Sequence, residues 1–344
     1  MMSRFVRLSA VGIALVAAAC AGEQRDAHGK ASVDIRVALL TAGPVSDAGW
    51  YAGAYEGIML LRDSLGAQVS HQQTRTPAEF DEAFLSYAST GYDLIFAHGF
   101  EYQDAAMRVG EQFPNTTFIV SSGGMYSSNV VPLIFQLEQG SYLAGMIAAG
   151  MSESGVVGMV GGVEIPTAKG TFVAFEAGAR AVDADVQVLE AFTGSWDDVA
   201  AAKEAAVAQL RRGADVIIHN VNAASFGVFQ AVREIVASGG TAWALGMNND
   251  QNDVAPDVIL GSAVLRIPWA FLETVEAWQS NSLGGQPLYA GSKDDVVDFV
   301  LNPLLADRVP ADLKARVERA RAQIRSGELE VPHVAYVEDD PGAP

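Results

Sequence analysis

The regular alternation of strand-like and helix-like segments is the feature that most constrains the fold of this 344-residue chain. Short apolar runs alternate with longer runs of helical periodicity, a pattern that predicts parallel strands covered by helices on both faces. The expected strands are residues 35–40, 68–72, 94–98, 117–121, 156–160, 186–189, 216–220, 242–247 and 258–264. The expected helices are residues 51–65, 78–90, 102–112, 140–151, 167–182, 199–212, 224–238 and 268–280.

An internal repeat predicts that this α/β pattern is built twice. One helix-like segment ends at Gly91 and leads into a strand that begins near Asp93, and a later segment does the same with Gly213 and Asp215. Glycine suits the left-handed backbone position that closes a helix. We therefore predict two similar doubly wound lobes with parallel sheets. The alternative is a chance similarity, since helix–glycine–strand joints are common in α/β proteins.

The N-terminal segment has the composition of a secretion signal. Arg4 and Arg7 precede a short apolar run that ends at Cys20, the only cysteine of the chain. Small residues before this cysteine resemble a bacterial lipoprotein signal, in which the cysteine is lipidated; an ordinary secretory signal is the alternative. We predict a signal peptide over residues 1–20, lipidation of Cys20 and a flexible tether over residues 21–33. No other segment is long and apolar enough to cross a membrane.

Composition and motifs argue against several functional classes. The formal net charge of −19 would repel a phosphate backbone, so no nucleic-acid partner is expected. Enzyme motifs such as HExxH, GxxxxGK[ST] and GxSxG are missing from the sequence. The five histidines do not show metal-ligand spacing, and we interpret His98 and His219 as hydrogen-bonded residues at the ends of equivalent strands. We predict no catalytic residue, no metal and no cofactor.

Aromatic, amide and acidic residues gather where the expected strands end. Ligands of open parallel sheets bind beyond the carboxyl ends of the strands, so two facing lobes would place two sets of strand ends across one cleft. Rings can stack on a flat ligand, and Asp or Asn can bond its hydroxyls or ring nitrogens. This inventory fits a sugar or a nucleoside better than an amino acid, although Phe226 could equally be a core residue. The residues concerned are Asp47, Trp50, Tyr51, Phe100, Trp196, Asn222, Phe226, Asn248 and Asp250.

Several strings in the same order resemble the basic membrane protein family of lipid-anchored, substrate-binding proteins of ABC importers, which are related to the purine nucleoside receptor PnrA. The resemblance extends from about Ile35 to about Gln279. It implies the fold of a type I periplasmic binding protein, in which two α/β lobes are joined by crossing hinge strands and close on a ligand. The strings are "SDAGWYAGAYEG", "FAHGFEYQDAAMRVGEQFPNTTFIVSSG", "EQGSYLAGMIA", "GMVGGVEIP" and "TGSWDD".

The resemblance also implies positions for the ligand contacts in the first lobe. The first family motif falls on residues 47–51, where Asp47 matches, Trp50 keeps an aromatic ring and Tyr51 replaces the usual asparagine. The strand-end glycine of the family and the aromatic residue after it fall on Gly99 and Phe100.

In the second lobe, Phe226 lies where the family has a base-stacking aromatic residue. Asn248 stands where the family has an acid that contacts the ribose, and Asp250 is retained. The position of a common hinge lysine is occupied by Leu265, and Arg266 follows it.

The crossing-chain pattern of the family predicts the lobe limits. Residues 34–137 and 262–290 form the first lobe, residues 138–261 and 291–336 form the second, and residues 337–344 form a C-terminal tail.

The sequence thus predicts an extracytoplasmic solute-binding lipoprotein that delivers a nucleoside-like ligand, in the first place a purine nucleoside, to an ABC permease in the membrane. A nucleoside-processing enzyme and a ligand-sensing subunit on the same scaffold are the alternatives.

Overall fold

The computed structural model describes residues 35–335. The predicted signal peptide, the lipidated Cys20, the tether and the C-terminal tail lie outside these residues.

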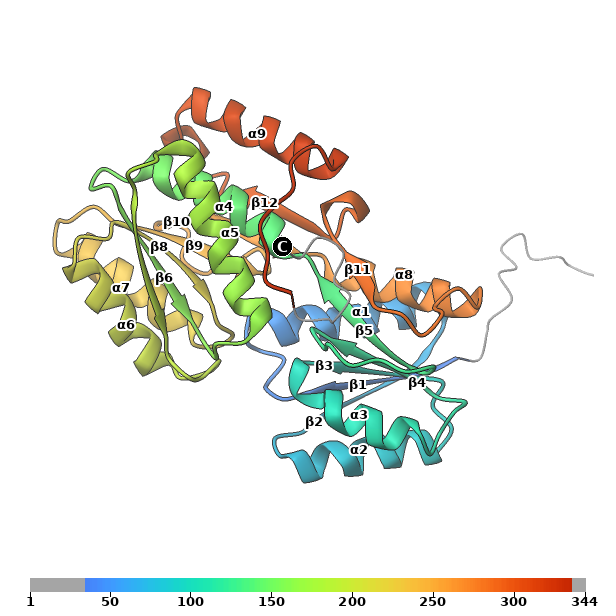
Figure 1. The fold of residues 1–344 in the computed structure, drawn as a ribbon. Helices are drawn as coiled ribbons and strands as arrows, with labels where there is room; N and C mark the ends of the chain where they lie inside the picture. Colours follow the sequence, from blue (N-terminus) through green and yellow to red (C-terminus); the bar gives the residue numbers. More distant parts are fainter. Residues whose placement is uncertain (1–34, 336–344) are drawn as a thin grey trace, which may run out of the picture. The chain divides into compact units, whose positions relative to one another are not determined.

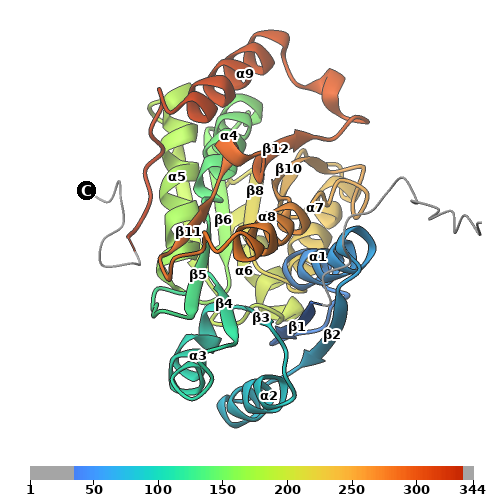
Figure 2. The same cartoon turned by 90° about the vertical axis from the view of Figure 1, so that its right-hand side faces the viewer.

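The first lobe contains a six-stranded sheet with the order β11-β5-β4-β3-β1-β2, in which all neighbouring strands are parallel. Helices α2 and α3 cover one face of this sheet, and α1 and α8 cover the other (Figures 1 and 2). The strands are β1 (Arg36–Thr41), β2 (Gln68–Gln73), β3 (Leu94–His98), β4 (Thr117–Ser121), β5 (Val130–Phe135) and β11 (Leu288–Ala290). The helices are α1 (Trp50–Leu65), α2 (Pro77–Ser89), the 3-10 turn η1 (Phe100–Tyr102), α3 (Gln103–Gly110) and α8 (Ile267–Gln279).

The second lobe repeats this arrangement with the strand order β12-β10-β9-β8-β6-β7, except that β12 is antiparallel to β10. Helices α6 and α7 cover one face, and α4 and α5 cover the other, with α9 beyond α4 (Figure 1). The strands are β6 (Val156–Gly161), β7 (Gln187–Phe192), β8 (Val216–Asn220), β9 (Trp243–Asn248), β10 (Ile259–Leu265) and β12 (Val297–Leu301). The helices are α4 (Glu138–Met151), α5 (Pro166–Val182), α6 (Val199–Arg211), α7 (Ser225–Ala237), α9 (Ala311–Ser326) and the 3-10 turns η2 (Ser292–Asp294) and η3 (Ala306–Arg308).

The predicted fold class, two α/β lobes with parallel sheets, is confirmed. Gly91 and Gly213 both have left-handed backbones, with φ of 81° and 99°, at the two helix–strand joints that suggested the repeat. The Asp93 amide donates to the Arg36 carbonyl, and the Asp215 amide makes the equivalent bond to Val156. Every strand and helix expected from the sequence is present, with ends shifted by no more than three residues. The sequence analysis did not predict β5, β11, β12 or α9.

The chain crosses between the two sheets at three places: between β5 and α4, between β10 and α8, and between β11 and β12. The third crossing is hydrogen-bonded to each of the other two. The Gln136 amide donates to the Ala290 carbonyl at 2.9 Å, and the Arg266 amide donates to the Val296 carbonyl at 2.7 Å. These crossings lie near the lobe limits predicted from the sequence, which we retain as a proposal.

Two glycines of α1 let side chains of α8, the helix that follows the second crossing, pack directly on the α1 backbone. A Cβ atom at Gly53 would lie 2.9 Å from the Ile267 side chain, and one at Gly57 would lie 2.6 Å from the Phe271 ring. A larger residue at either position would displace these side chains, so the two glycines of the segment "WYAGAYEG" permit the close packing of α1 on α8. Trp50 and Tyr51 begin α1 at the carboxyl end of the sheet.

Candidate ligand-binding site

The Asp47 carboxylate fastens the start of α1. It accepts hydrogen bonds from the amides of Gly49, Tyr51 and Ala52 at 3.1, 2.8 and 2.9 Å, and its side chain is fully buried. These amides are among the donors that a helix N-terminus leaves without an intrahelical partner. Burial raises the pKa of Asp47, and the three backbone hydrogen bonds act in the opposite direction. Asp47 therefore fixes the N-terminus of α1, the helix that begins with Trp50 and Tyr51.

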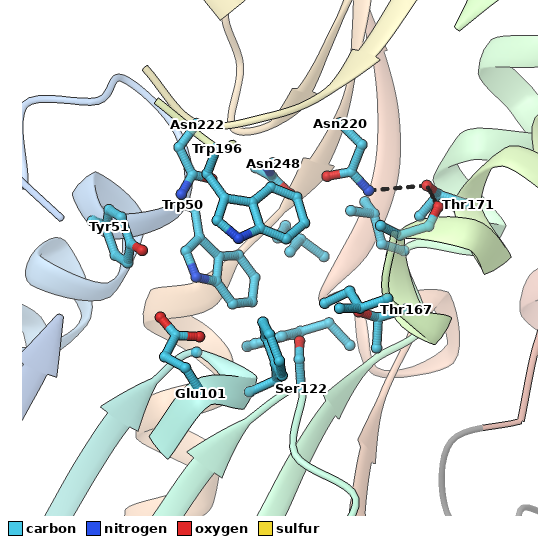
Figure 3. Close-up of a pocket in the computed structure, with 17 residues that line it drawn as sticks. Trp50, Tyr51, Glu101, Ser122, Thr167, Thr171, Trp196, Asn220, Asn222 and Asn248 are labelled. Carbon is cyan, nitrogen blue, oxygen red and sulfur yellow. Dashed lines mark hydrogen bonds between the residues drawn. The ribbon is translucent and has the colours of Figure 1, made fainter. Parts of the chain in front are cut away.

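A cavity lies between the lobes and is lined by residues from both (Figure 3). The empty space of the cavity is about 600 Å³, and this volume includes space that is open to the solvent. The lining residues of the first lobe and its crossings are Trp50, Tyr51, Gly99, Phe100, Glu101, Ser122, Phe135 and Leu137. Those of the second lobe are Ile165, Thr167, Ala168, Thr171, Trp196, Asn220, Asn222, Asn248 and Leu265.

The Trp50 ring is the aromatic wall that the first lobe contributes, and other rings support it. It stacks on His98 with ring centroids 3.9 Å apart and an angle of 26° between the planes, and it meets Phe135 edge to face. The buried His98 shares a hydrogen bond between Nδ1 and Ser121 Oγ at 2.8 Å. Burial lowers the pKa of His98 to about 3, so the supporting ring is neutral at physiological pH.

The second lobe contributes Trp196 from the loop after β7. The Trp196 carbonyl accepts from the amides of Asn222 and Ala224 at 2.9 and 3.3 Å, which ties this loop to the end of β8. The indole lies on Gly162, where a Cβ atom would come within 2.8 Å of Trp196 Cδ2. Glycine at 162 is therefore needed for the ring to lie flat on the backbone.

Amide side chains from the second sheet supply most of the neutral polar groups of the cavity. Asn220 Nδ2 donates to Thr171 Oγ1 at 2.9 Å, and this bond is drawn in Figure 3. Asn222 and Asn248 are buried, and within residues 35–335 their side-chain amides make no hydrogen bond. The donor and the acceptor of each of these amides are therefore available to bond a ligand.

Two of the lining residues hold left-handed backbones without being glycine. Ser122 has a φ of 59° directly after β4, and Asn248 has a φ of 73° at the end of β9. The two strands occupy equivalent places in the two sheets. Strain of this kind concentrates at binding sites.

Glu101 is the charged residue of the lining. Burial raises the pKa of Glu101 to about 7. Asp197, which follows Trp196 on the opposite lobe, also has a raised pKa because of burial. Arg266 is turned away from the cavity, because its guanidinium donates to the Asp295 carbonyl at 2.6 Å and to Asp298 Oδ2 at 3.4 Å.

The cavity brings together most of the residues predicted to bind a ligand. Asp47, Phe226 and Asp250 lie outside its lining. Asp47 caps α1, Phe226 is 39% exposed at the start of α7, and the exposed Asp250 accepts from the Asn252 amide at 3.0 Å. The seven predicted residues that line the cavity are Trp50, Tyr51, Gly99, Phe100, Trp196, Asn222 and Asn248.

The sequence analysis missed five polar lining residues: Glu101, Ser122, Thr167, Thr171 and Asn220. Asn220 ends β8 and Ser122 follows β4, so the strand-end rule that found Asn222 and Asn248 could have found both. Thr167 and Thr171 lie one turn apart on α5, which carried no signal of a site.

His98 and His219 are hydrogen-bonded strand-end residues, as expected from the sequence. His219 Nε2 lies 2.8 Å from Gln251 Oε1, and neither histidine lines the cavity. Within residues 35–335, no group of three or more His, Cys, Asp or Glu residues could hold a metal ion. Over the same residues, no helix combines the length and apolar character needed to span a bilayer.

Two α/β lobes, three crossings of the chain and a cleft lined from both sides define the class of type I periplasmic binding proteins. A solute-binding protein of an ABC transporter system from Aeropyrum pernix K1 has the same fold, with a TM-score of 0.77 at 21% identity over 90% of this chain and 95% of that one. The family model described as ABC transporter substrate-binding protein PnrA-like matches residues 35–333. The chain belongs to this family.

Two relatives carry names that describe a ligand. The ABC transporter nucleoside-binding protein BmpA of Lactococcus lactis subsp. cremoris (strain MG1363) is 26% identical over 96% of this chain and 99% of its own length. A purine-binding protein of Brucella abortus (strain 2308) is 28% identical over 92% of this chain and 88% of its own length. The family resemblance seen in the sequence is thus confirmed. The chain is the ligand-binding component of an ABC transporter and not an enzyme.

Proposed function

We propose that this chain binds a nucleoside-like solute, in the first place a purine nucleoside, in the cleft between its lobes. The observation that carries the proposal is the composition of the cavity, in which Trp50 and Trp196 come from opposite lobes and buried amides surround them. Indole rings stack on any flat heterocycle at low entropic cost, and amides can meet both donors and acceptors of a base or a sugar. The names of the two relatives support the same ligand class.

In this proposal the residues divide into two roles. Trp50, Phe100 and Trp196 stack on the base, and Tyr51, Asn222 and Asn248 bond its edge or the sugar hydroxyls. Gly99 contributes backbone to the wall of the cavity beside Phe100. The predicted contacts of Asp47, Phe226 and Asp250 remain part of the proposal.

Ligand binding would hold the lobes together. One hydrogen bond already joins the two lobes, from Gln251 Nε2 of the second lobe to the Ala48 carbonyl of the first at 3.4 Å. A solute that contacts both lobes favours the closed arrangement by its differential affinity for it. No bond of the ligand is made or broken in this process.

We further propose that the protein works outside the cytoplasm, attached to the membrane through a lipid on Cys20, and passes its ligand to an ABC permease. A family of ABC substrate-binding proteins and a signal-like N-terminus support this location. Labelling cells with a radioactive fatty acid tests the anchor, because replacing Cys20 by Ala should abolish the labelled band.

A thermal-shift screen of the purified protein against nucleosides, free bases and sugars tests the ligand class, since a ligand that binds only the folded state raises the melting temperature. We expect purine nucleosides to give the largest shifts, and calorimetry should then show one site per chain. A screen in which only sugars or amino acids raise the melting temperature would refute the proposal.

A further inference from the structure

Glu101 places a carboxyl group inside the cavity without a cation beside it. It belongs to η1, which follows the end of β3, and a Cβ atom at Gly99 would collide with its carboxyl group. Gly99 has a φ of 155°, so both the backbone and the space at this position suit glycine alone. Over residues 35–335, no other side chain donates a hydrogen bond to Glu101 or forms an ion pair with it.

The charges that face Glu101 are negative. The charge of Asp197, on the opposite lobe, adds to the effect of burial in raising the pKa of Glu101. Burial raises the pKa of Tyr51 on α1 and of Tyr102 on η1, and the Glu101 charge raises both further, so both phenols stay protonated. The lining contains no Lys, Arg or His, and the nearby Arg266 is bonded away from the cavity.

The two sides of the cavity differ in character. Figure 3 shows Tyr51 and Glu101 on one side, and Thr167, Thr171 and Asn220 on the other. A ligand that spans the cavity therefore meets an acid at one end and neutral amides and hydroxyls at the other. Neither end offers the positive charge that a phosphate or a carboxylate needs when it leaves water.

We propose that Glu101 makes this site select its ligand by charge: it accepts a hydrogen bond from an uncharged solute and excludes solutes that carry a phosphate or a carboxylate. An anion held near a like charge in a poorly screened cavity is repelled, and rejection of this kind is a means of specificity. The inference rests on the proposed function and narrows it to free nucleosides as opposed to nucleotides.

Calorimetry at pH 8 with adenosine and adenosine 5′-monophosphate tests the inference. We expect the wild-type protein to bind adenosine at least about 100-fold more tightly than the monophosphate. Glu101→Gln keeps the shape of the side chain but removes its charge. It should reduce the ratio of the adenosine affinity to the monophosphate affinity at least about tenfold, which corresponds to about 1.4 kcal/mol. Glu101→Asp keeps the charge and should retain the rejection. Glu111→Gln, at an exposed position after α3, is the matched control and should leave both affinities unchanged.

A pH titration of the wild-type protein provides a second readout that needs no variant. Adenosine should bind more weakly at pH 6 than at pH 8, because protonation of Glu101 removes the negative charge that strengthens the hydrogen bond it accepts from the ligand. The affinity of Glu101→Gln for adenosine should not change over this range.

The outcomes separate the two ideas. If adenosine binds the wild-type protein but the monophosphate binds equally well, or Glu101→Gln leaves the ratio unchanged, the charge selection is wrong and the nucleoside proposal stands. If no nucleoside binds the wild-type protein, the proposed function fails and the inference fails with it.

Discussion

The imidazole of His98 lies flat against the indole of Trp50, with ring centroids 3.9 Å apart. His98 ends β3 and Trp50 begins α1, so the contact joins the carboxyl end of a central strand of the first sheet to the helix that Asp47 caps. One face of the indole is therefore covered by protein, and the ring is held in place before a ligand arrives. A rigid, supported ring loses little entropy when a base stacks on it.

Trp50→Ala should weaken nucleoside binding at least tenfold, a loss of more than about 1.4 kcal/mol, because one of the two stacking rings of the first lobe is removed. Calorimetry with the best nucleoside of the screen measures the effect. Trp269→Ala is the control, because this indole is 52% exposed on α8 and does not line the cavity. Equal affinities for wild type and Trp50→Ala would show that Trp50 is no part of the site.

Gly162→Ala should also weaken binding, although residue 162 does not line the cavity. The added methyl group would push against the Trp196 indole and displace it from the backbone on which it lies. We expect a loss of about fivefold to fiftyfold in affinity, of the order of 1–2 kcal/mol. The double variant Gly162→Ala with Trp196→Ala provides the check. If the glycine acts through the indole, its effect disappears once the ring is absent, whereas an additive loss would contradict this mechanism.

Ser122→Gly should stabilise the protein. A left-handed backbone at a residue other than glycine costs about 1–2 kcal/mol, and the added flexibility of glycine in the unfolded chain takes back part of this gain. Urea unfolding should therefore give an increase of about 0.5–1 kcal/mol. Ser121→Gly is the contrasting variant and should destabilise, because Ser121 is in β4 and bonds His98. A loss of stability in Ser122→Gly would contradict the interpretation of Ser122 as strained.

The protein should lose stability in acid because its strand-end histidines are buried and neutral. Burial lowers the pKa of His219 to about 4, below the value of about 6.5 expected in the unfolded chain. Between these two values His219 is protonated in the unfolded state but neutral in the folded state, so the free energy of unfolding decreases as the pH drops from about 6.5 toward 4. His219→Gln should flatten this dependence by up to about 1.4 kcal/mol per pH unit. Urea unfolding at several pH values measures it, and an unchanged slope would contradict the assignment.

Much of the fold followed from the sequence, because the chain obeys the local rules of α/β proteins. The exceptions have physical reasons. Strand β5 was not predicted because Pro132 interrupts its apolar run. The structure tolerates this proline because the pairing of β11 with β5 begins only at Leu133, so no backbone N–H is needed at position 132 on the β11 side. Helix α9 is strongly charged and buries only a narrow stripe of its surface, which left a weak apolar pattern.

The candidate site was predictable where strand ends carry the side chains. The rule led to Trp50, Asn222 and Asn248, all of which line the cavity. It could not show that Asp47 faces the helix amides, since an acid in such a turn can equally cap a helix or bind a ligand. Glu101 escaped because its orientation depends on the 3-10 turn and on the space above Gly99, neither of which a local pattern encodes.

The contact between Gly53 and Ile267 links the binding site to the second crossing of the chain. Ile267 is the first residue of α8, and one residue separates it from β10 of the second lobe. Trp50 and Tyr51 begin α1, the helix on whose flank Ile267 packs at Gly53. A side chain at position 53 would therefore disturb the packing of α1 on α8 and, with it, the placement of the two rings in the cavity.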